Sequence, residues 1–310
     1  MWAWTSYDWA NSAFATVVLA GFFPIFFKDF WQPAGTTDAV STWRLGVCHS
    51  VVSGCVVLSL PLLGAIGDAA GVRKRLLLSF AALGVIGTGA LALIGQGQWL
   101  LAGAAFVLAA IGFYAGNSFY DSLLVGVAPP AKRERVSALG YALGYLGGGL
   151  LLAVCVLALR QPAWFGAENS VGVVRGSFLA VALWWGLFSI PLARWVAEPA
   201  ARSRATGAAL GEGLREVWHT IRAIRQHRVV MVFLLAYWLY IDAVDTIILM
   251  AVDYGRNLGF SASSLILALL LTQLVGFPAS LLYGRLGERW GSRKALLVGL
   301  AVYLLATLGA

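Results

Sequence analysis

Apolar residues along this chain gather into nine runs, each long enough to cross the ~30 Å hydrocarbon core of a bilayer as a helix. The runs cover about 9–27, 43–66, 76–95, 99–127, 136–159, 174–196, 229–252, 261–283 and 295–310. Short polar segments, several of them basic, separate these runs. Because a backbone in lipid must satisfy its own hydrogen bonds, the pattern predicts an all-α integral membrane protein.

One polar segment occurs twice. It reads GAIGDAAGVRKR over 64–75 and GRLGERWGSRKA over 284–295, with an offset of 220 residues. Six positions match in register, and as pairs they are Gly64 and Gly284, Gly67 and Gly287, Asp68 and Glu288, Gly71 and Gly291, Arg73 and Arg293, and Lys74 and Lys294. The glycines permit a tight turn and close helix approach. The repeat indicates that the chain arose by duplication of a bundle of membrane helices.

The offset also predicts the domain organisation. It aligns the last three runs with the first three, so residues 1–196 form an N-terminal six-helix bundle and 229–310 begin a second bundle. Three more helices would complete the second bundle, so we expect nine spans of a twelve-helix protein, with the C-terminal part truncated. Residues 197–228 are expected to form a cytoplasmic linker with an amphipathic helix. Its apolar positions at helical spacing are Leu210, Leu214, Val217, Ile221 and Ile224.

Composition supports a lipid environment and sets the orientation. Hydrophobic residues make up 60% of the chain, charged residues only 12%, and the mean hydropathy is +0.81. The net charge of +8 does not indicate nucleic-acid binding, because the basic residues lie in short gaps between the apolar runs. Of the 22 Lys and Arg, 17 fall on one side of an alternating nine-span chain. The positive-inside rule therefore predicts a cell-membrane protein with a cytoplasmic N-terminus.

Neither a metal nor a cofactor is expected. The three cysteines, Cys48, Cys55 and Cys155, fall inside apolar runs and have no metal-ligand spacing. A nucleotide-binding loop of the Gly-x-x-x-x-Gly-Lys type is absent from the sequence, which argues against ATP-driven pumping. The partners we expect are a small-molecule substrate, protons and the lipid bilayer, with the protein acting as a monomer.

The sharpest chemical candidates lie in the seventh run. Asp242 and Asp245 are one turn apart, and Asp242 lies about 20 Å along the helix from Val229, near the bilayer midplane. Ionisable groups at that depth are costly and usually functional. We expect the two carboxyls to bind protons or substrate, with Tyr237 and Tyr240 donating hydrogen bonds nearby. The alternative is a carboxyl pair that only supports helix packing.

Weaker candidates lie in other runs. Asp8 and Asn11 share a face near the start of the first run, where Asp8 could instead cap the helix. Asn117 and Asp121 lie in the fourth run, and Gln273 in the eighth, where a helix–helix hydrogen bond is its default role. Small residues four apart also predict a close packing seam in the fifth run, and they are Gly140, Gly144 and Gly148.

These motifs together resemble a known family. The doubled segment resembles the loop between helices 2 and 3 of the major facilitator superfamily. The stretches YDWANSAF at 7–14, YID at 240–242 and DTII at 245–248 resemble the vacuole-effluxer branch, named after an autophagy-related protein of fungal vacuoles. Ala243 and Asp245 depart from the Gly and Asn expected in that branch.

The resemblance implies a twelve-helix rocker-switch transporter and, from the fungal relatives, amino-acid efflux. Many members are bacterial, which implies an inner-membrane location. The doubled segment would form a cytoplasmic gate, and Asp121 would face Arg73 as a latch. The run with Gly140 lacks the Gly-Pro pair of drug–proton antiporters, which argues against a multidrug role.

The leading hypothesis is a multi-pass secondary active transporter for a small organic solute, plausibly an amino acid, coupled to protons. One alternative is an intramembrane aspartyl hydrolase, although its Gly-x-Gly-Asp pattern is absent from the sequence. The other is a non-transporting receptor or assembly factor with the same fold. Solute flux, peptide cleavage and binding without translocation would separate the three.

Overall fold

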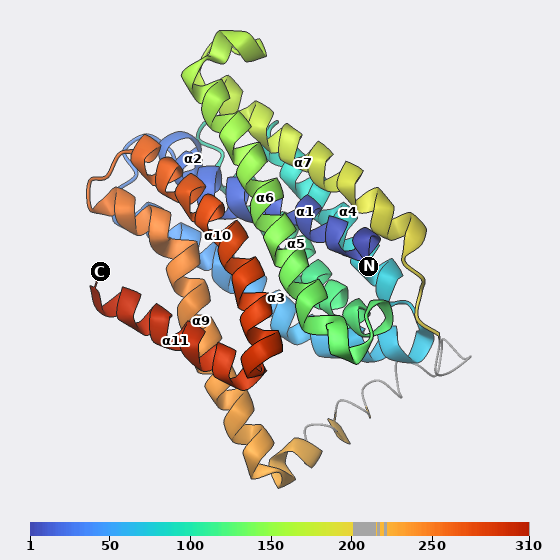
Figure 1. Cartoon of the computed structure of the whole chain (residues 1–310). Helices are drawn as coiled ribbons and strands as arrows, with labels where there is room; N and C mark the ends of the chain where they lie inside the picture. The colour runs from blue at the N-terminus through green and yellow to red at the C-terminus, as the bar shows by residue number, and fades with distance from the viewer. Residues whose placement is uncertain (201–214, 216–217, 220–221, 310) are drawn as a thin grey trace.

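The computed structural model describes residues 1–200, 215, 218–219 and 222–309, and its regular elements in this part of the chain are all helical (Figure 1). The first span is one continuous rod of α1 (Trp2–Ala13), π-helical η1 (Phe14–Phe22), α2 (Phe23–Phe26) and π-helical η2 (Phe27–Trp31). The rest are α3 (Asp38–Ala70), α4 (Arg73–Leu91), α5 (Trp99–Val127), η3 (Pro130–Lys132), α6 (Arg133–Arg160), η4 (Pro162–Phe165), α7 (Ser170–Trp195), α9 (Arg228–Asn257), α10 (Ala262–Trp290) and α11 (Ser292–Gly309).

All nine predicted apolar runs coincide with helices, which confirms the all-α membrane prediction. Within the described ranges, eight helices are long and apolar enough to cross a bilayer, counting Trp2–Trp31 as one. The ninth run corresponds to α11, which is not among the eight. Several helices extend beyond their apolar runs, whereas α4 ends at Leu91, before the end of the run 76–95. The first span, for example, begins at Trp2 rather than near residue 9.

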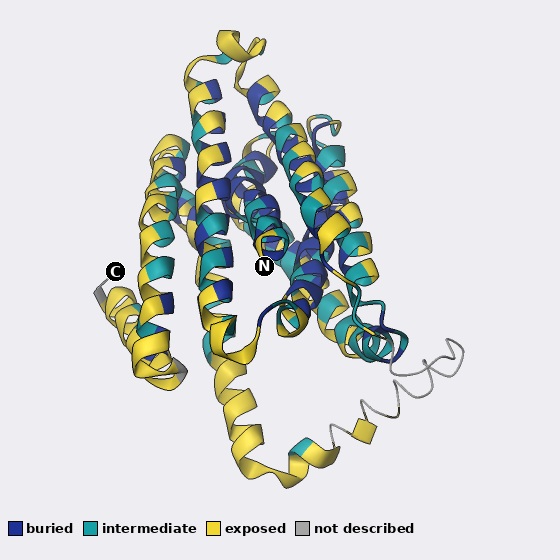
Figure 2. Ribbon diagram, turned by 45° about the vertical axis from the view of Figure 1, so that its right-hand side comes forward, coloured by how far each residue is buried: buried dark blue, intermediate teal, exposed yellow. Residues whose placement is uncertain are grey.

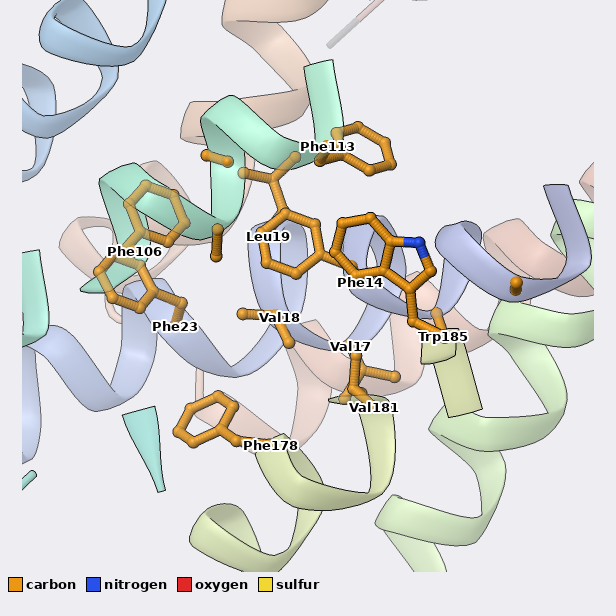
Figure 3. Packing of buried hydrophobic residues seen from close by; sticks show 14 of the residues in the cluster. Phe14, Val17, Val18, Leu19, Phe23, Phe106, Phe113, Phe178, Val181 and Trp185 are labelled. Carbon is orange, nitrogen blue, oxygen red and sulfur yellow. The ribbon is translucent and has the colours of Figure 1, made fainter. Parts of the chain in front are cut away.

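The core lies around the first span. That rod buries 83% of its most apolar window, whereas α9 buries none of its own. Aromatic side chains dominate the packing shown in Figure 3. Phe23 stacks on Phe106 of α5 at 3.8 Å between ring centroids, and Phe14 meets Trp185 of α7 at 5.5 Å. Figure 2 shows the contrast, with dark buried segments inside the N-terminal bundle and a long exposed stretch on α9.

The glycine stripe of α6 is a packing seam, as predicted. A Cβ built on Gly140 would lie 2.8 Å from the Asp8 carboxylate, and one on Gly144 would lie 2.4 Å from the Ser12 hydroxyl. At Gly148 it would lie 2.8 Å from the backbone oxygen of Ser12. Because contacts this close exclude any larger side chain, the seam holds α6 directly against α1.

A neighbouring face of α6, about 100° around the helix, contacts the second bundle. A Cβ on Gly149 of α6 would lie 2.8 Å from Gln273 of α10, and one on Gly276 of α10 would lie 2.5 Å from the Tyr145 ring. Helix α6 therefore lies between α1 and α10, side by side with both (Figure 1). Gln273 belongs to this helix–helix interface.

In both copies of the repeat, a glycine with positive φ ends the helix. Gly71 ends α3 with φ +65° and donates its N–H to the Gly67 carbonyl, and α4 begins two residues later at Arg73. Gly291 ends α10 with φ +81° and donates to the Gly287 carbonyl at 2.9 Å. Only glycine adopts positive φ without strain, so the match explains why this position is glycine in both copies.

The predicted linker helix lies mainly outside the described residues. Of its five apolar positions only Ile224 is described, and it belongs to a helical segment that precedes α9. The other four, Leu210, Leu214, Val217 and Ile221, lie outside the described part of the chain.

Candidate functional site

A cavity of about 620 Å³ lies where α9 faces the N-terminal bundle. Helix α3 forms one wall and α9 forms the facing wall. Tyr114 of α5 also lines the cavity. The polar lining residues are His49, Ser50, Ser53, Tyr114, Asp242, Asp245 and Thr246. The structure therefore brings both predicted carboxyls into one cavity between the two bundles.

The cavity lies deep along both helices. The Thr42 hydroxyl on α3 donates to Asp253 Oδ2 on α9 at 2.8 Å. These two residues therefore lie at the same level across the bilayer and serve as the reference for depth along both helices. From there His49 lies seven residues along α3 and Asp245 eight residues along α9, about 10 and 12 Å respectively. The two residues thus face each other at a similar depth within the spans.

Tyr237 and Tyr240 do not belong to this cavity. Their rings contact each other at 5.3 Å between centroids on α9, and neither lines the space beside Asp242. Two residues along a helix correspond to about 200° of rotation, so Tyr240 points away from the face that carries Asp242. The expectation that these tyrosines assist the carboxyls is therefore wrong for this conformation.

A second polar group forms inside the N-terminal bundle. The Asn11 side-chain amide donates to the side-chain oxygen of Asn117, which joins α1 to α5. One turn earlier on α1, Asp8 accepts from the Tyr120 hydroxyl at 3.3 Å. The alternative reading of Asp8 as a helix cap is wrong, because α1 begins at Trp2 with Met1 at the cap position.

The first copy of the repeat binds its own bundle. Arg73 forms an ion pair with Asp68 and donates to the Ser122 carbonyl of α5 at 3.3 Å. No ion pair joins Arg73 to Asp121 among the described residues, so the predicted latch is not formed here. The turn at Gly71 reverses the chain and brings Asp68 directly beside Arg73.

The neighbouring lysine binds another helix end. Lys74 Nζ donates to the carbonyls of Ala193 and Val196 at 3.2 and 2.8 Å, at the C-terminus of α7. A cation there satisfies the last carbonyls and complements the helix dipole. The first copy thus ties α3 and α4 to α5 and α7.

The second copy instead contacts the other bundle. A Cβ on Gly284 would lie 2.5 Å from Ala138 of α6, and one on Gly287 would lie 3.2 Å from the Glu134 carboxylate. Glu288 lines a separate cavity of about 540 Å³ at this end, while Arg293 and Lys294 are exposed at the start of α11. Each copy turns at a glycine with positive φ, but the two have different neighbours.

At the opposite end of α9 lies a charged group that the sequence reasoning missed, here termed the Lys28 cluster. Lys28 Nζ lies 3.6 Å from Asp253 Oδ1 and 3.4 Å from Asp38 Oδ1, and it donates to Asn257 Oδ1 at 2.6 Å. The side chains of Lys28 and Asp253 are only 8% and 3% exposed. With Thr42, these residues join the first span and α3 to α9.

An exposed ion pair lies beside the cluster. Arg256 binds both carboxylate oxygens of Asp29 at 3.0 and 3.1 Å. Two ion pairs, Lys28 with Asp253 and Asp29 with Arg256, join the first span to α9. All four residues lie just beyond the apolar runs, where the sequence pattern indicates solvent. The opposite charges at the ends of these two spans were the one sequence signal for the pairing.

His49 is the second residue that the sequence reasoning missed. It lies inside the apolar run 43–66, and a polar side chain in hydrocarbon was the signal that singled out Asp242. Its ring packs edge-on against Phe106 at 5.3 Å between centroids. The Nε2 atom is buried and has no hydrogen-bond partner within the described ranges.

Among the residues that the structure describes, no group of three or more His, Cys, Asp or Glu is arranged to hold a metal ion.

Comparison with known proteins places this geometry in a family. A family model described as Vacuole effluxer Atg22 like matches residues 40–129 and 126–308. A Bacillus subtilis protein described as uncharacterized MFS-type transporter YxiO is 37% identical over 305 residues, which cover 98% of this chain and 71% of that protein.

More distant relatives agree. Autophagy-related protein 22-2 of Emericella nidulans is 25% identical over 188 residues, and the match covers 54% of this chain but only 32% of the fungal protein. The xylose transporter XylE from E. coli, in a partially occluded inward open conformation, superposes with a TM-score of 0.63 at 13% identity. That match covers 93% of this chain and 72% of XylE, and it shows the fold.

Proposed function

Because this chain belongs to the vacuole effluxer Atg22-like family of the major facilitator superfamily, we propose that it is a secondary active transporter for a small organic solute, plausibly an amino acid. Membership makes it a multi-pass membrane transporter. The substrate class, the coupling to protons and the direction of transport are what we propose beyond family membership. We take efflux as the direction, because the family is described as a vacuole effluxer.

The observation that carries the proposal is the cavity between α3 and α9. A volume of about 620 Å³ falls within the ~300–1,000 Å³ typical of small-molecule sites. Asp242 and Asp245 offer carboxylates that can accept hydrogen bonds from an ammonium group. An amine-bearing solute is therefore the natural ligand of the α9 wall.

The same carboxyls support proton coupling. They lie one turn apart inside a span, where an unpaired charge is costly. Along α9 they are about 12 Å (Asp245) and about 17 Å (Asp242) from Asp253. A carboxylate that binds the ammonium group of the solute can bind a proton instead, so one proton can be exchanged against the solute. The driving force would then be a proton gradient.

Alternating access is supported by the two ends of the bundle interface. The Lys28 cluster joins α9 to the N-terminal bundle at one end, and the second repeat joins α10 to α6 at the other. Opening one set of contacts while the other holds would expose the cavity to one side at a time. By the positive-inside rule, the repeat end is cytoplasmic and the N-terminus lies inside the cell.

A hydrolase is less well supported. Both aspartates of the cavity lie on α9, and the facing wall on α3 supplies histidine and serine rather than a third carboxyl among the described lining residues. A receptor with the same fold would bind solute without moving it, and it is distinguished by the transport assay.

The test uses the full chain in proteoliposomes loaded with radiolabelled amino acids, with and without a pH gradient. We expect gradient-dependent flux, and Asp242→Asn should lower it by at least about tenfold by removing a carboxylate of the cavity. Glu168→Gln, an exposed carboxylate between η4 and α7, is the matched control and should leave flux unchanged. Flux indifferent to both the gradient and Asp242→Asn would reject proton coupling, and absence of flux would reject transport.

A further inference from the structure

We propose that His49 recognises the carboxylate of the transported solute and so selects for solutes that carry an acid group as well as an amine. The inference rests on the proposed transport function and adds a second recognition element to the same cavity. It assigns one wall of the cavity to each end of the solute.

The distribution of charge in the cavity leads to this assignment. Every carboxylate that lines it comes from α9, and the described lining residues include neither lysine nor arginine. His49 is the only side chain of this lining set that bears a nitrogen donor. The carboxylates of α9 repel an anionic solute group, which therefore lies at the α3 wall.

Hydrogen-bonding capacity on α3 agrees with the charge. Ser50 and Ser53 line the cavity beside His49, and their exposed hydroxyls bond to no other residue in the described part of the chain. Hydroxyl and imidazole N–H groups donate readily to a carboxylate. The α3 wall thus offers donors, whereas the α9 wall offers acceptors from Asp242 and Asp245.

The unpartnered nitrogen of His49 strengthens the argument. Buried polar atoms in proteins almost always have a partner, and one left without costs about 1–3 kcal/mol. Nε2 of His49 is buried and has none among the described residues, while the residue itself lines a polar cavity. A solute carboxylate that reaches this nitrogen would supply the missing acceptor.

Packing holds the ring in place for this role. The edge-on contact with Phe106 fixes the imidazole from the side of α5. The similar heights of His49 and Asp245, measured from the Thr42–Asp253 hydrogen bond, place the donor and acceptor walls opposite each other. A solute with both groups on one carbon skeleton can contact both walls at once.

The experiment compares amino acids with the amines that lack only the carboxylate. Full-length wild-type protein and His49→Leu are reconstituted in proteoliposomes, and flux is measured for leucine and isoamylamine and for lysine and cadaverine. We expect His49→Leu to lower amino-acid flux at least tenfold while amine flux changes less than twofold. His49→Gln, which keeps a side-chain donor, should recover part of the amino-acid flux.

Controls separate this inference from the transport proposal. Cys55→Leu, on an exposed face of the same helix, should leave both fluxes unchanged. Equal loss of amino-acid and amine flux in His49→Leu, or no loss, would overturn the role of His49 and leave transport intact. Loss of gradient dependence with unchanged selectivity would assign His49 to protons instead. A wild-type protein that moves none of the four compounds would overturn both proposals.

Discussion

The Lys28 cluster and the cavity are two polar regions where α9 meets the same bundle, and they differ in how their polar groups are satisfied. They lie only about 12 Å apart along α9, the eight residues from Asp245 to Asp253. In the cluster, Lys28, Asp253 and Asn257 bind one another. In the cavity, His49 Nε2 and both serine hydroxyls lack a partner among the described residues.

The contrast shows how α3 and α9 can both close one end of the bundle interface and bind a solute in the cavity between them. Groups that satisfy each other stabilise one conformation, and removing one leaves its partner buried and unpaired. Groups that face a cavity without partners contribute little to stability and are free for an exchangeable ligand. Variants in the two regions should therefore affect different measurements.

The largest expected effect comes from the centre of the cluster. Asp253→Ala should lower the free energy that holds this end of the bundle interface closed by about 3 kcal/mol. This value is in the lower part of the range for breaking a buried ion pair, because Asp38 and Asn257 still contact Lys28. Spin labels at Ala39→Cys and Leu258→Cys, in a background without the three native cysteines, should report a shift to longer distances.

A double replacement provides the control for that prediction. Lys28→Met combined with Asp253→Leu leaves no buried ion unpaired, because Asp38, the other acid beside Lys28, is 75% exposed, and most of the closure should return. If the single variant leaves the distance distribution unchanged, the cluster does not hold this end closed. Equal opening in the single and double variants would assign the effect to lost packing.

Two single-hydroxyl variants on α3 compare the cluster with the cavity, and their expected effects on stability are smaller. Thr42→Val removes a hydroxyl that donates to the Asp253 carboxylate at 2.8 Å, and it should cost about 1.5–3 kcal/mol of stability. Ser53→Ala removes a hydroxyl that only faces the cavity, and it should cost less than about 0.5 kcal/mol. Thermal unfolding of the two purified variants in detergent measures the difference. Equal losses would contradict the division into satisfied and unsatisfied regions.

Local patterns predicted much of this architecture. Nine apolar runs correspond to nine helical spans, and each copy of the Gly-rich segment turns at a glycine with positive φ, Gly71 and Gly291. The stripe that contains Gly144 contacts α1 as its spacing predicts. These features depend on hydrophobicity, on φ and on side-chain size, all of which a single segment of sequence contains.

Features that depend on distant segments were harder to predict. The pairing of Lys28 with Asp253 joins residues 225 positions apart, and neither lies inside an apolar run. Arg73 binds Asp68 rather than Asp121, because the turn places Asp68 nearer. Helical geometry alone would have separated Tyr240 from Asp242, and the rule that identified Asp242 would also have identified His49.

The smallest expected effect lies at the rim of the cluster. Arg256 and Asp29 form a two-bond ion pair at 3.0 Å, but their side chains are 28% and 46% exposed. Solvent screens such a pair, so Arg256→Ala should change closure of this end by less than about 1 kcal/mol. The same spin-label distances measure it, and the shift should shrink further at high salt. A change as large as that of Asp253→Ala would mean that the exposed pair, rather than buried Lys28, holds α9 to the N-terminal bundle.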